Sequence, residues 1–151
     1  MVDWPKLIIS IVICQAAGII GSFFTRSVNS WYKTLAKPSF NPPNWLFGPV
    51  WTLLFLLMGI SLYLLWTANA PWQVFLLFGG QLMLNVLWSV LFFGLHNPGA
   101  AFVEIIILWL AILATAIIAY SSSPAAAYLF IPYLAWVGFA ALLNFSIWQL
   151  N

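Results

Sequence analysis

The sequence has very few charged residues. Only 4% of its 151 residues are Asp, Glu, Lys or Arg, whereas 65% are hydrophobic. A water-soluble domain carries about 25% charged residues, and a chain with so few would not stay in solution. The composition therefore excludes an ordinary soluble protein and predicts an integral membrane protein whose solvent is the lipid bilayer.

Basic residues, cysteine and histidine are also scarce, and each shortage excludes a class of function. Four Lys or Arg residues and a net charge of +2 are too few to neutralise a run of phosphates, so we expect no nucleic-acid partner. The single cysteine, Cys14, excludes an internal disulfide and reads as a small buried hydrophobe. The single histidine, His96, has no partner motif, so we predict no metal site and no covalently attached haem.

Long apolar runs are what the sequence has in abundance. Five runs of about 18–24 residues are each long enough to cross roughly 30 Å of hydrocarbon as a helix. Strands of a membrane barrel would be about ten residues long with alternating polarity, so these continuous runs favour helices. Prolines lie at or just before the starts of the later spans. This position fits the first turn of a helix, where the N–H that proline lacks has no partner within the helix. The predicted spans are residues 7–24, 45–66, 72–93, 100–120 and 125–148.

These spans predict an all-α membrane protein, a five-transmembrane-helix bundle formed by a single domain over residues 1–151. The first run is longer than the apolar core of a typical signal peptide, and Asp3 weakens the basic segment before it. We therefore expect a retained first span. The short connectors near residues 68 and 122 force the spans that they join to run antiparallel.

The few charges predict how the bundle is oriented. The connector after the first span carries Arg26, Lys33 and Lys37 without an acid, whereas the connectors after the second and fourth spans carry no charge. The positive-inside rule then places this first connector in the cytoplasm. With five spans, the C-terminus is also cytoplasmic and the N-terminus lies outside.

The stretch from Trp31 to Trp51 is the longest part of the chain that cannot be one regular helix. It holds four of the nine prolines and three of the ten tryptophans. A long structured loop between membrane spans commonly covers or forms a site. We therefore expect a structured loop between the first two spans that acts as a lid.

Amide and indole side chains inside the spans indicate inward-facing surfaces. Gln81, Asn85 and Trp88 lie on one helical face of the third span. An amide in hydrocarbon is costly unless it is paired, so this face points into the bundle. Its role is either to fix helix packing through a hydrogen bond or to orient a ligand.

Two further stripes face the same interior. The second span contributes Trp51, Phe55 and Met58, and the fifth contributes Trp136, Ala140 and Asn144. Together the three stripes predict a flat, mostly apolar pocket with a few polar groups, suited to a planar aromatic ligand. Glu104, the only acid inside a span, is either a structural or a functional group.

Three motifs carry a resemblance to a known family. They are WYKTLAKPSFNPP at residues 31–43, followed by Trp51, then NVLWS at 85–89 and PYLAW at 132–136. The chain resembles the TspO/MBR family of tryptophan-rich sensory proteins and translocator proteins over essentially its whole length. The resemblance implies a homodimeric five-helix protein of the lipid bilayer that binds porphyrins such as protoporphyrin IX and haem-type tetrapyrroles, with the porphyrin as ligand and no resident cofactor.

The resemblance also implies binding of isoquinoline carboxamides and of sterols in a pocket under the first loop. Together with the inward-facing stripes, it gives the following set of expected ligand-binding residues. They are Ser22, Trp31, Tyr32, Pro42, Trp51, Phe55, Gln81, Asn85, Trp88, Trp136 and Ala140.

Departures from the family pattern change some of these expectations. The last span has no Tyr followed by a basic residue, a sterol-associated pattern, which weakens the alternative of sterol or lipid binding. Phe40 stands where many members have Trp. The absence of a basic tail favours the cell membrane of a prokaryote over a mitochondrial one.

An enzymatic alternative stays open. Some relatives are proposed to degrade porphyrin in light and oxygen, which would use Trp51 and Trp136 as electron donors. The sequence offers no nucleophile or acid–base pair for ordinary catalysis, so we expect a binding protein for sensing, transport or regulation.

Overall fold

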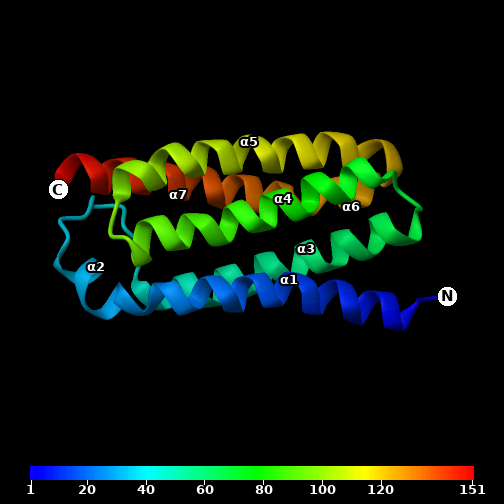
Figure 1. Cartoon of the computed structure of the whole chain (residues 1–151), viewed down its shortest axis with the longest axis horizontal. Coiled ribbons are helices and arrows are strands. Elements are labelled where there is room, and N and C mark those ends of the chain that lie inside the picture. The colour runs from blue at the N-terminus through cyan, green and yellow to red at the C-terminus, as the bar shows by residue number, and fades with distance from the viewer.

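The computed structural model describes all residues from 1 to 151 and consists of helices joined by short connectors (Figure 1). Five helical segments are long and apolar enough to cross a membrane, as predicted. The main helices are α1 (Trp4–Phe24), α3 (Phe47–Thr67), α4 (Trp72–Ser89), α5 (Pro98–Ser122), α6 (Pro124–Tyr128) and α7 (Ile131–Leu150). The shorter elements are the 3-10 helices η1 (Thr25–Asn29) and η2 (Asn44–Leu46), the helix α2 (Trp31–Thr34) and the π-helical turn η3 (Val90–Gly94).

Polar caps set where α1 and α5 begin. The Asp3 carboxylate accepts from the Lys6 N–H at 3.2 Å, so α1 starts at Trp4 and not at residue 7. The Asn97 side chain accepts from the Ala100 N–H at 3.0 Å at the start of α5, which begins at Pro98. Each such cap contributes about 1 kcal/mol by satisfying an N–H that has no partner within the helix.

The fifth span is divided into two helices, whereas the sequence predicted one helix at 125–148. The cause is Pro132, which has no N–H and whose ring clashes with the carbonyl four residues earlier, on Tyr128. Helix α6 ends at that residue, and α7 begins three residues later. The break frees the Ala126 carbonyl, which accepts from the Ser61 hydroxyl of α3 at 2.9 Å.

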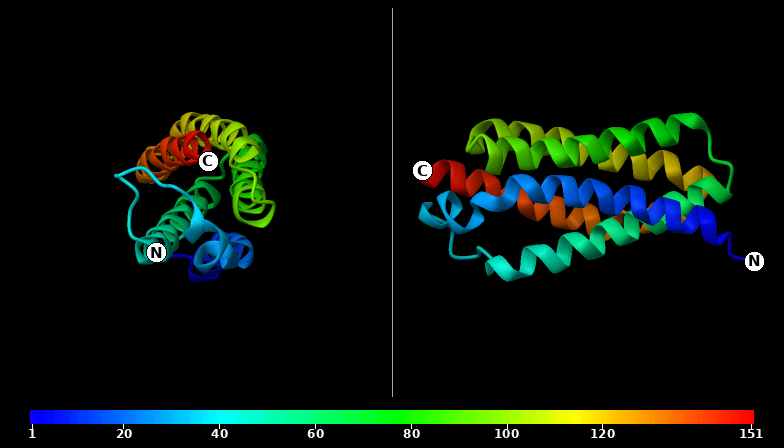
Figure 2. Two further views of the ribbon diagram at one scale, coloured as in Figure 1. Left: turned by 90° about the vertical axis from the view of Figure 1, so that its left-hand side faces the viewer. Right: turned by 60° about the horizontal axis from the view of Figure 1, so that its bottom comes forward.

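The helices surround a central axis in the order α3, α1, α4, α5 and α7 (Figure 2). Helix α1 packs between α3 and α4, and α5 packs between α4 and α7. The N-terminus lies at one end of the bundle, whereas the C-terminus and the connector around α2 lie at the other (Figure 1). At that end the connector between α2 and α3 crosses over the bundle (Figure 2).

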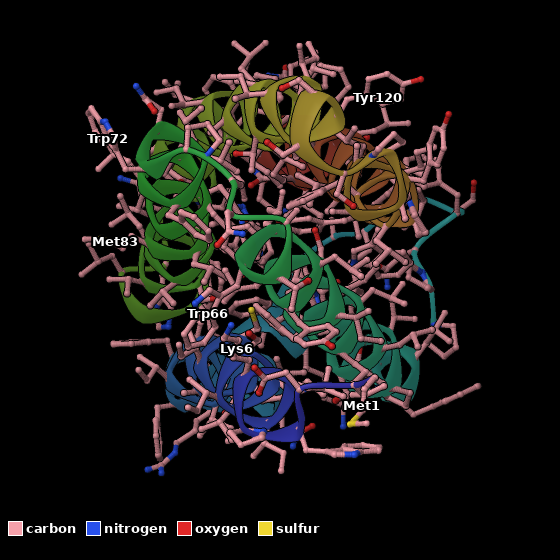
Figure 3. The ribbon with its side chains drawn as sticks, turned by 90° about the vertical axis from the view of Figure 1, so that its right-hand side faces the viewer. Met1, Lys6, Trp66, Trp72, Met83 and Tyr120 are labelled. Atoms are coloured by element: carbon pink, nitrogen blue, oxygen red, sulfur yellow. The ribbon has the colours of Figure 1, made fainter.

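The outer surface of the bundle is apolar. Trp72, Met83 and Tyr120 point outward (Figure 3), and Met83 is 75% exposed. A surface of this kind is stable only in lipid. The chain is therefore a multi-pass integral membrane protein.

The connector between α1 and α3 is structured by contacts to the rest of the chain. Trp31 stacks on His96 with ring centroids 4.3 Å apart, and Ser27 donates a hydrogen bond to the Phe93 carbonyl at 2.9 Å. Asn151, at the end of α7, holds Ala36 through two hydrogen bonds of 3.0 and 2.9 Å. The predicted structured loop is thus tied to η3 and to the end of α7.

Candidate ligand-binding cavity

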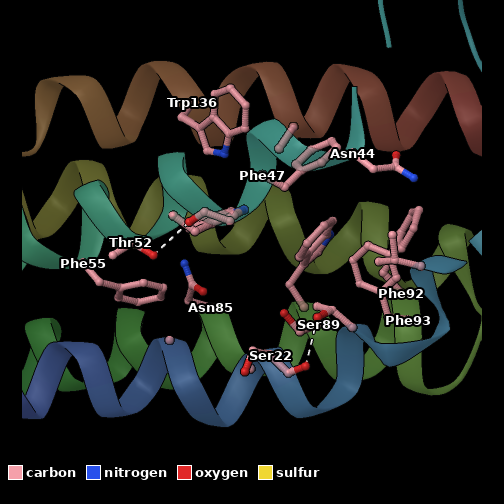
Figure 4. Close-up of a pocket in the computed structure, with 18 of the residues that line it drawn as sticks. Ser22, Asn44, Phe47, Thr52, Phe55, Asn85, Ser89, Phe92, Phe93 and Trp136 are labelled. Carbon is pink, nitrogen blue, oxygen red and sulfur yellow. Dashed lines mark hydrogen bonds between the residues drawn. The ribbon is translucent and has the colours of Figure 1, made fainter. Parts of the chain in front are cut away.

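A cavity of about 460 Å³ lies in the half of the bundle next to the connector (Figure 4). Its 24 lining residues come mainly from α1, α3, α4 and α7. This volume falls within the usual range for small-molecule sites. The small residues Gly21 and Ala140 face the space and keep it open.

Aromatic rings form two walls of the cavity. Trp51 and Phe55 of α3 lie with ring centroids 5.8 Å apart, and Phe47 meets Trp136 of α7 edge to face at 6.1 Å. Phe55 reaches α1 because Gly18 has no side chain, since a Cβ there would lie 2.6 Å from the Phe55 ring. These flat apolar walls suit a planar ligand.

Asn85 of α4 is a polar group of the cavity lining, and the part of the cavity around it is called the inner end below. Its Nδ2 donates to the Tyr133 hydroxyl at 2.7 Å, and that hydroxyl donates to Gln81 Oε1 at 2.8 Å. Gln81 Nε2 in turn lies 3.5 Å from the Met58 sulfur. The three amide and phenol groups are buried, and they form a continuous chain from the cavity into the core.

Trp88 and Asn144 line the cavity but already bind each other. The Trp88 Nε1–H donates to Asn144 Oδ1 at 3.0 Å, and Asn144 Nδ2 donates to the Pro98 carbonyl at 2.7 Å. These bonds join α4, α7 and the start of α5. For this pair, the hydrogen bonds fix helix packing, and they leave the ring of Trp88 as its ligand-facing surface.

Trp136 differs from Trp88 because its indole N–H has no partner. The Nε1 atom is buried and makes no hydrogen bond in the protein. Figure 4 shows this nitrogen on the side of the ring that faces the cavity. An unpaired buried donor costs about 1–3 kcal/mol, which an acceptor on a ligand would recover.

The cavity reaches the outer surface between α1 and α3. Ile19, Ser22, Gly48 and Thr52 line it and are themselves exposed. Gln15 crosses below this opening and donates to the Thr52 carbonyl at 3.1 Å. The cavity is therefore open to the lipid-facing side of the bundle at this rim.

Tyr32 of α2 closes the cavity on the connector side. Its side chain is buried, packs against Phe93 at 5.6 Å and donates its hydroxyl hydrogen to Asn41 at 2.8 Å. Burial raises the pKa of Tyr32, and the hydrogen bond to Asn41 lowers it by less. Tyr32 therefore stays a neutral phenol at physiological pH.

The structure brings together most of the residues expected to bind a ligand. Eight of them line the cavity: Ser22, Tyr32, Trp51, Phe55, Asn85, Trp88, Trp136 and Ala140. Trp31, Pro42 and Gln81 do not line it. Trp31 stacks on His96, Pro42 lies in the connector, where its carbonyl accepts from Asn41, and Gln81 lies behind Asn85.

Several lining residues were missed by the sequence reasoning. Gln15, Phe47, Thr52 and Ser89 line the cavity, and none had been singled out as a ligand contact. The signal for Gln15 was available, because it is the one amide in the first span.

Glu104 lies on α5 outside the cavity lining, and both of its buried oxygens lack a hydrogen-bond partner.

Comparison with known proteins identifies the family. The model of the TspO/MBR family matches residues 10–149. The chain belongs to the TspO/MBR family. It is 51% identical to the tryptophan-rich protein TspO of Archaeoglobus fulgidus, over 97% of each chain.

Two other members of the TspO/MBR family are similar along most of their length. The tryptophan-rich protein TspO of Chlorobaculum tepidum is 47% identical, with 96% of this chain and 95% of the relative covered. The translocator protein of Ovis aries is 37% identical, with 98% of this chain and 91% of the relative covered. The similarity therefore includes the connector and all four helices that line the cavity.

Proposed function

We propose that this protein is a membrane receptor or transporter-like protein that binds porphyrins, and ligands of the isoquinoline-carboxamide type, in the cavity beneath the connector. The observation that carries the proposal is the unpartnered indole N–H of Trp136 in an aromatic-walled cavity. Such a donor suits a ligand that combines a flat apolar ring system with a carbonyl or carboxylate. The open rim between α1 and α3 allows a large macrocycle to extend beyond the enclosed space.

Protoporphyrin IX binding to the purified protein in detergent tests this proposal. We expect quenching of tryptophan fluorescence that saturates, with an affinity at least about tenfold weaker in Ala140→Phe, because the added ring occupies the cavity. The matched control is Leu142→Phe on the same helix, where the side chain is 55% exposed on the outer surface. Equal affinities for the two variants would contradict binding in this cavity.

A second function is favoured by the position of Trp51 and Trp136, which line the same cavity. In light and air, the excited state of a porphyrin bound between them would take an electron from an indole and pass it to molecular oxygen, leaving the indole oxidised. The superoxide formed would then oxidise the macrocycle. The test is the loss of porphyrin absorbance under illumination in air. Loss that depends on Trp51, measured against Trp51→Phe, would support degradation, whereas bleaching equal to that with an unrelated membrane protein would exclude it.

The membrane and its sidedness are part of the same proposal. Bacterial and archaeal relatives support a prokaryotic cell membrane. The connector with Arg26, Lys33 and Lys37 and the end of α7 lie at one end of the bundle, consistent with a cytoplasmic position for both. A second copy of the chain stays the expected partner.

A further inference from the structure

We propose that Met58, Gln81 and Tyr133 fix the direction of the Asn85 amide, so that the inner end of the cavity accepts a hydrogen bond. The ligands favoured there are planar apolar molecules with an N–H or O–H donor on the inserted edge. This inference rests on the proposed function, because it specifies which chemistry the same cavity selects. None of Met58, Gln81 and Tyr133 lines the cavity, so they act as positioning residues.

The sulfur of Met58 determines the direction of the chain of hydrogen bonds. A thioether sulfur accepts hydrogen bonds and cannot donate them. Of the two ends of the Gln81 amide, only the NH₂ group is therefore stabilised against the sulfur, at 3.5 Å. The Gln81 oxygen then faces the Tyr133 hydroxyl, which lies 2.8 Å away and donates to it.

The direction passes from Tyr133 to Asn85. The single hydroxyl hydrogen of Tyr133 is used by Gln81, so the hydroxyl oxygen can only accept from Asn85. The Asn85 Nδ2 atom is accordingly the end held against Tyr133, at 2.7 Å. The reverse order would place the Gln81 oxygen against the sulfur, where neither atom could donate.

The Asn85 oxygen is consequently the end of the amide that a ligand can use. It has no partner in the protein, and it is not among the polar atoms that are both buried and unpaired. Figure 4 shows the Asn85 side chain projecting into the space between Phe55 and Ser89. An acceptor at this point stabilises a donor and leaves an acceptor-only edge unpaired.

Two probes of the same shape test whether Asn85 presents an acceptor or a donor to the cavity. Carbazole has an N–H donor where dibenzofuran has an ether oxygen, and both are flat and small enough for the cavity. Their affinities would be measured by calorimetry in one detergent and corrected for partition into empty micelles. The measured quantity is the affinity for carbazole divided by that for dibenzofuran, compared with the same ratio in Asn85→Leu so that other lining groups cancel.

The expected ratio in the wild-type protein is about fivefold above that of Asn85→Leu, the size of one hydrogen bond. Gln81→Glu should keep the wild-type ratio, because a protonated carboxyl donates its O–H to the Met58 sulfur while its other oxygen still accepts from Tyr133. Gln81→Leu should lower the carbazole to dibenzofuran ratio below the ratio of Asn85→Leu. Without Gln81, the Tyr133 hydroxyl donates to the Asn85 oxygen, and the Asn85 NH₂ group then faces the cavity. Met58→Leu should lower the ratio without changing any lining residue.

The outcomes separate this inference from the proposed function. Binding of both probes with the same ratio in wild type and Asn85→Leu would overturn the inference and leave the cavity as a binding site. A ratio unchanged in Gln81→Leu, in protein whose helical circular dichroism is intact, would also overturn it. If Gln81→Leu does not fold, the ratios of Met58→Leu and Gln81→Glu are compared instead. Equal ratios in these two variants would overturn the inference. A third outcome would overturn the proposed function and this inference together. In it, neither probe binds the wild type, and Ala140→Phe and the wild type have the same affinity for protoporphyrin IX.

Discussion

Trp136 carries a polar group that the fold leaves unused. Trp88 and Trp109 both donate their indole N–H, to Asn144 and to the Leu134 carbonyl, each at 3.0 Å. The Trp136 N–H has no such acceptor although it is buried. A buried donor without a partner is destabilising, and it is retained most readily where it serves a ligand.

Replacing Trp136 by Phe should therefore affect binding more than stability. We expect the affinity for xanthone, a flat ligand with one carbonyl acceptor, to fall about three- to tenfold, the range for a single neutral hydrogen bond. The unfolding temperature of the ligand-free protein should stay the same or rise, since an unpaired donor is removed. Trp72→Phe on the lipid-facing surface is the control. A drop in stability with unchanged affinity would show that the ring only packs.

Tyr32 provides a pH-dependent test of the connector. Burial raises the pKa of this phenol above its ordinary value of 10.0, so the folded state holds the proton more tightly than the unfolded state. Its contribution to stability is complete below the unfolded pKa and is lost as the pH rises through the folded pKa. We expect the thermal stability of the wild type to fall above about pH 10 more steeply than that of Tyr32→Phe.

The titration itself can be followed by the ultraviolet absorbance of tyrosinate. The difference between wild type and Tyr32→Phe should show one phenol that titrates above the exposed tyrosines. A difference curve centred below pH 10 would mean that the hydrogen bond to Asn41, which lowers the pKa, outweighs burial.

At the level of helices, the sequence was enough to predict the membrane spans. It was not enough to predict which residues of the connector contact the cavity. Apolar runs of this length have few alternatives to a transmembrane helix, so all five spans were predicted. The break before α7 was missed because an apolar run does not reveal whether a proline such as Pro132 starts a helix or interrupts one. Gln81 was expected at the ligand because periodicity gives the face of a helix but not the partner that covers it.

The contact between α1 and α3 depends on Gly59. A Cβ at this position would lie 2.7 Å from the Ile11 Cα atom, a backbone atom that can move only with its helix. Gly59→Ala should therefore lower the free energy of unfolding by about 1–3 kcal/mol, a typical cost of overpacking. Gly79→Ala is the matched control, because nothing lies within 4 Å of a Cβ there. Thermal unfolding in detergent measures both, and equal effects would contradict close packing at Gly59.

The connector is held by Asn151, which makes its lid role testable. Asn151→Ala removes both hydrogen bonds to Ala36, and we expect faster trypsin cleavage after Lys33, since Pro38 blocks cleavage after Lys37. Gln149→Ala, an exposed change two residues before Asn151 that removes no contact to the connector, should be cleaved like the wild type. Protoporphyrin IX should slow cleavage in the wild type. Cleavage that is unaffected by both Asn151→Ala and the ligand would make the segment a simple connector.

At the scale of the whole molecule, the two ends of the bundle differ in charge and in structure. The cavity, the basic connector and the end of α7 share one end, while Asp3 and Lys6 pair at the other with a separation of 3.4 Å. Figure 3 shows Lys6 beside Trp66 at that end, 5.7 Å from the ring centroid. The excess positive charge at the connector end therefore biases which side of the membrane the cavity faces, since Lys6 at the other end is balanced by Asp3.

Single cysteines would establish that side. Cys14 is fully buried and would be replaced by Ala to remove the background. In intact cells, a membrane-impermeant maleimide should label Ala68→Cys, in the exposed turn between α3 and α4, and should not label Thr34→Cys in α2. Inverted vesicles should give the opposite pattern, because we expect the positive charge of the connector to keep it on the cytoplasmic side. Labelling of Thr34→Cys in intact cells would place the cavity on the outer side, and a ligand made in the cytoplasm would then have to enter through the rim between α1 and α3.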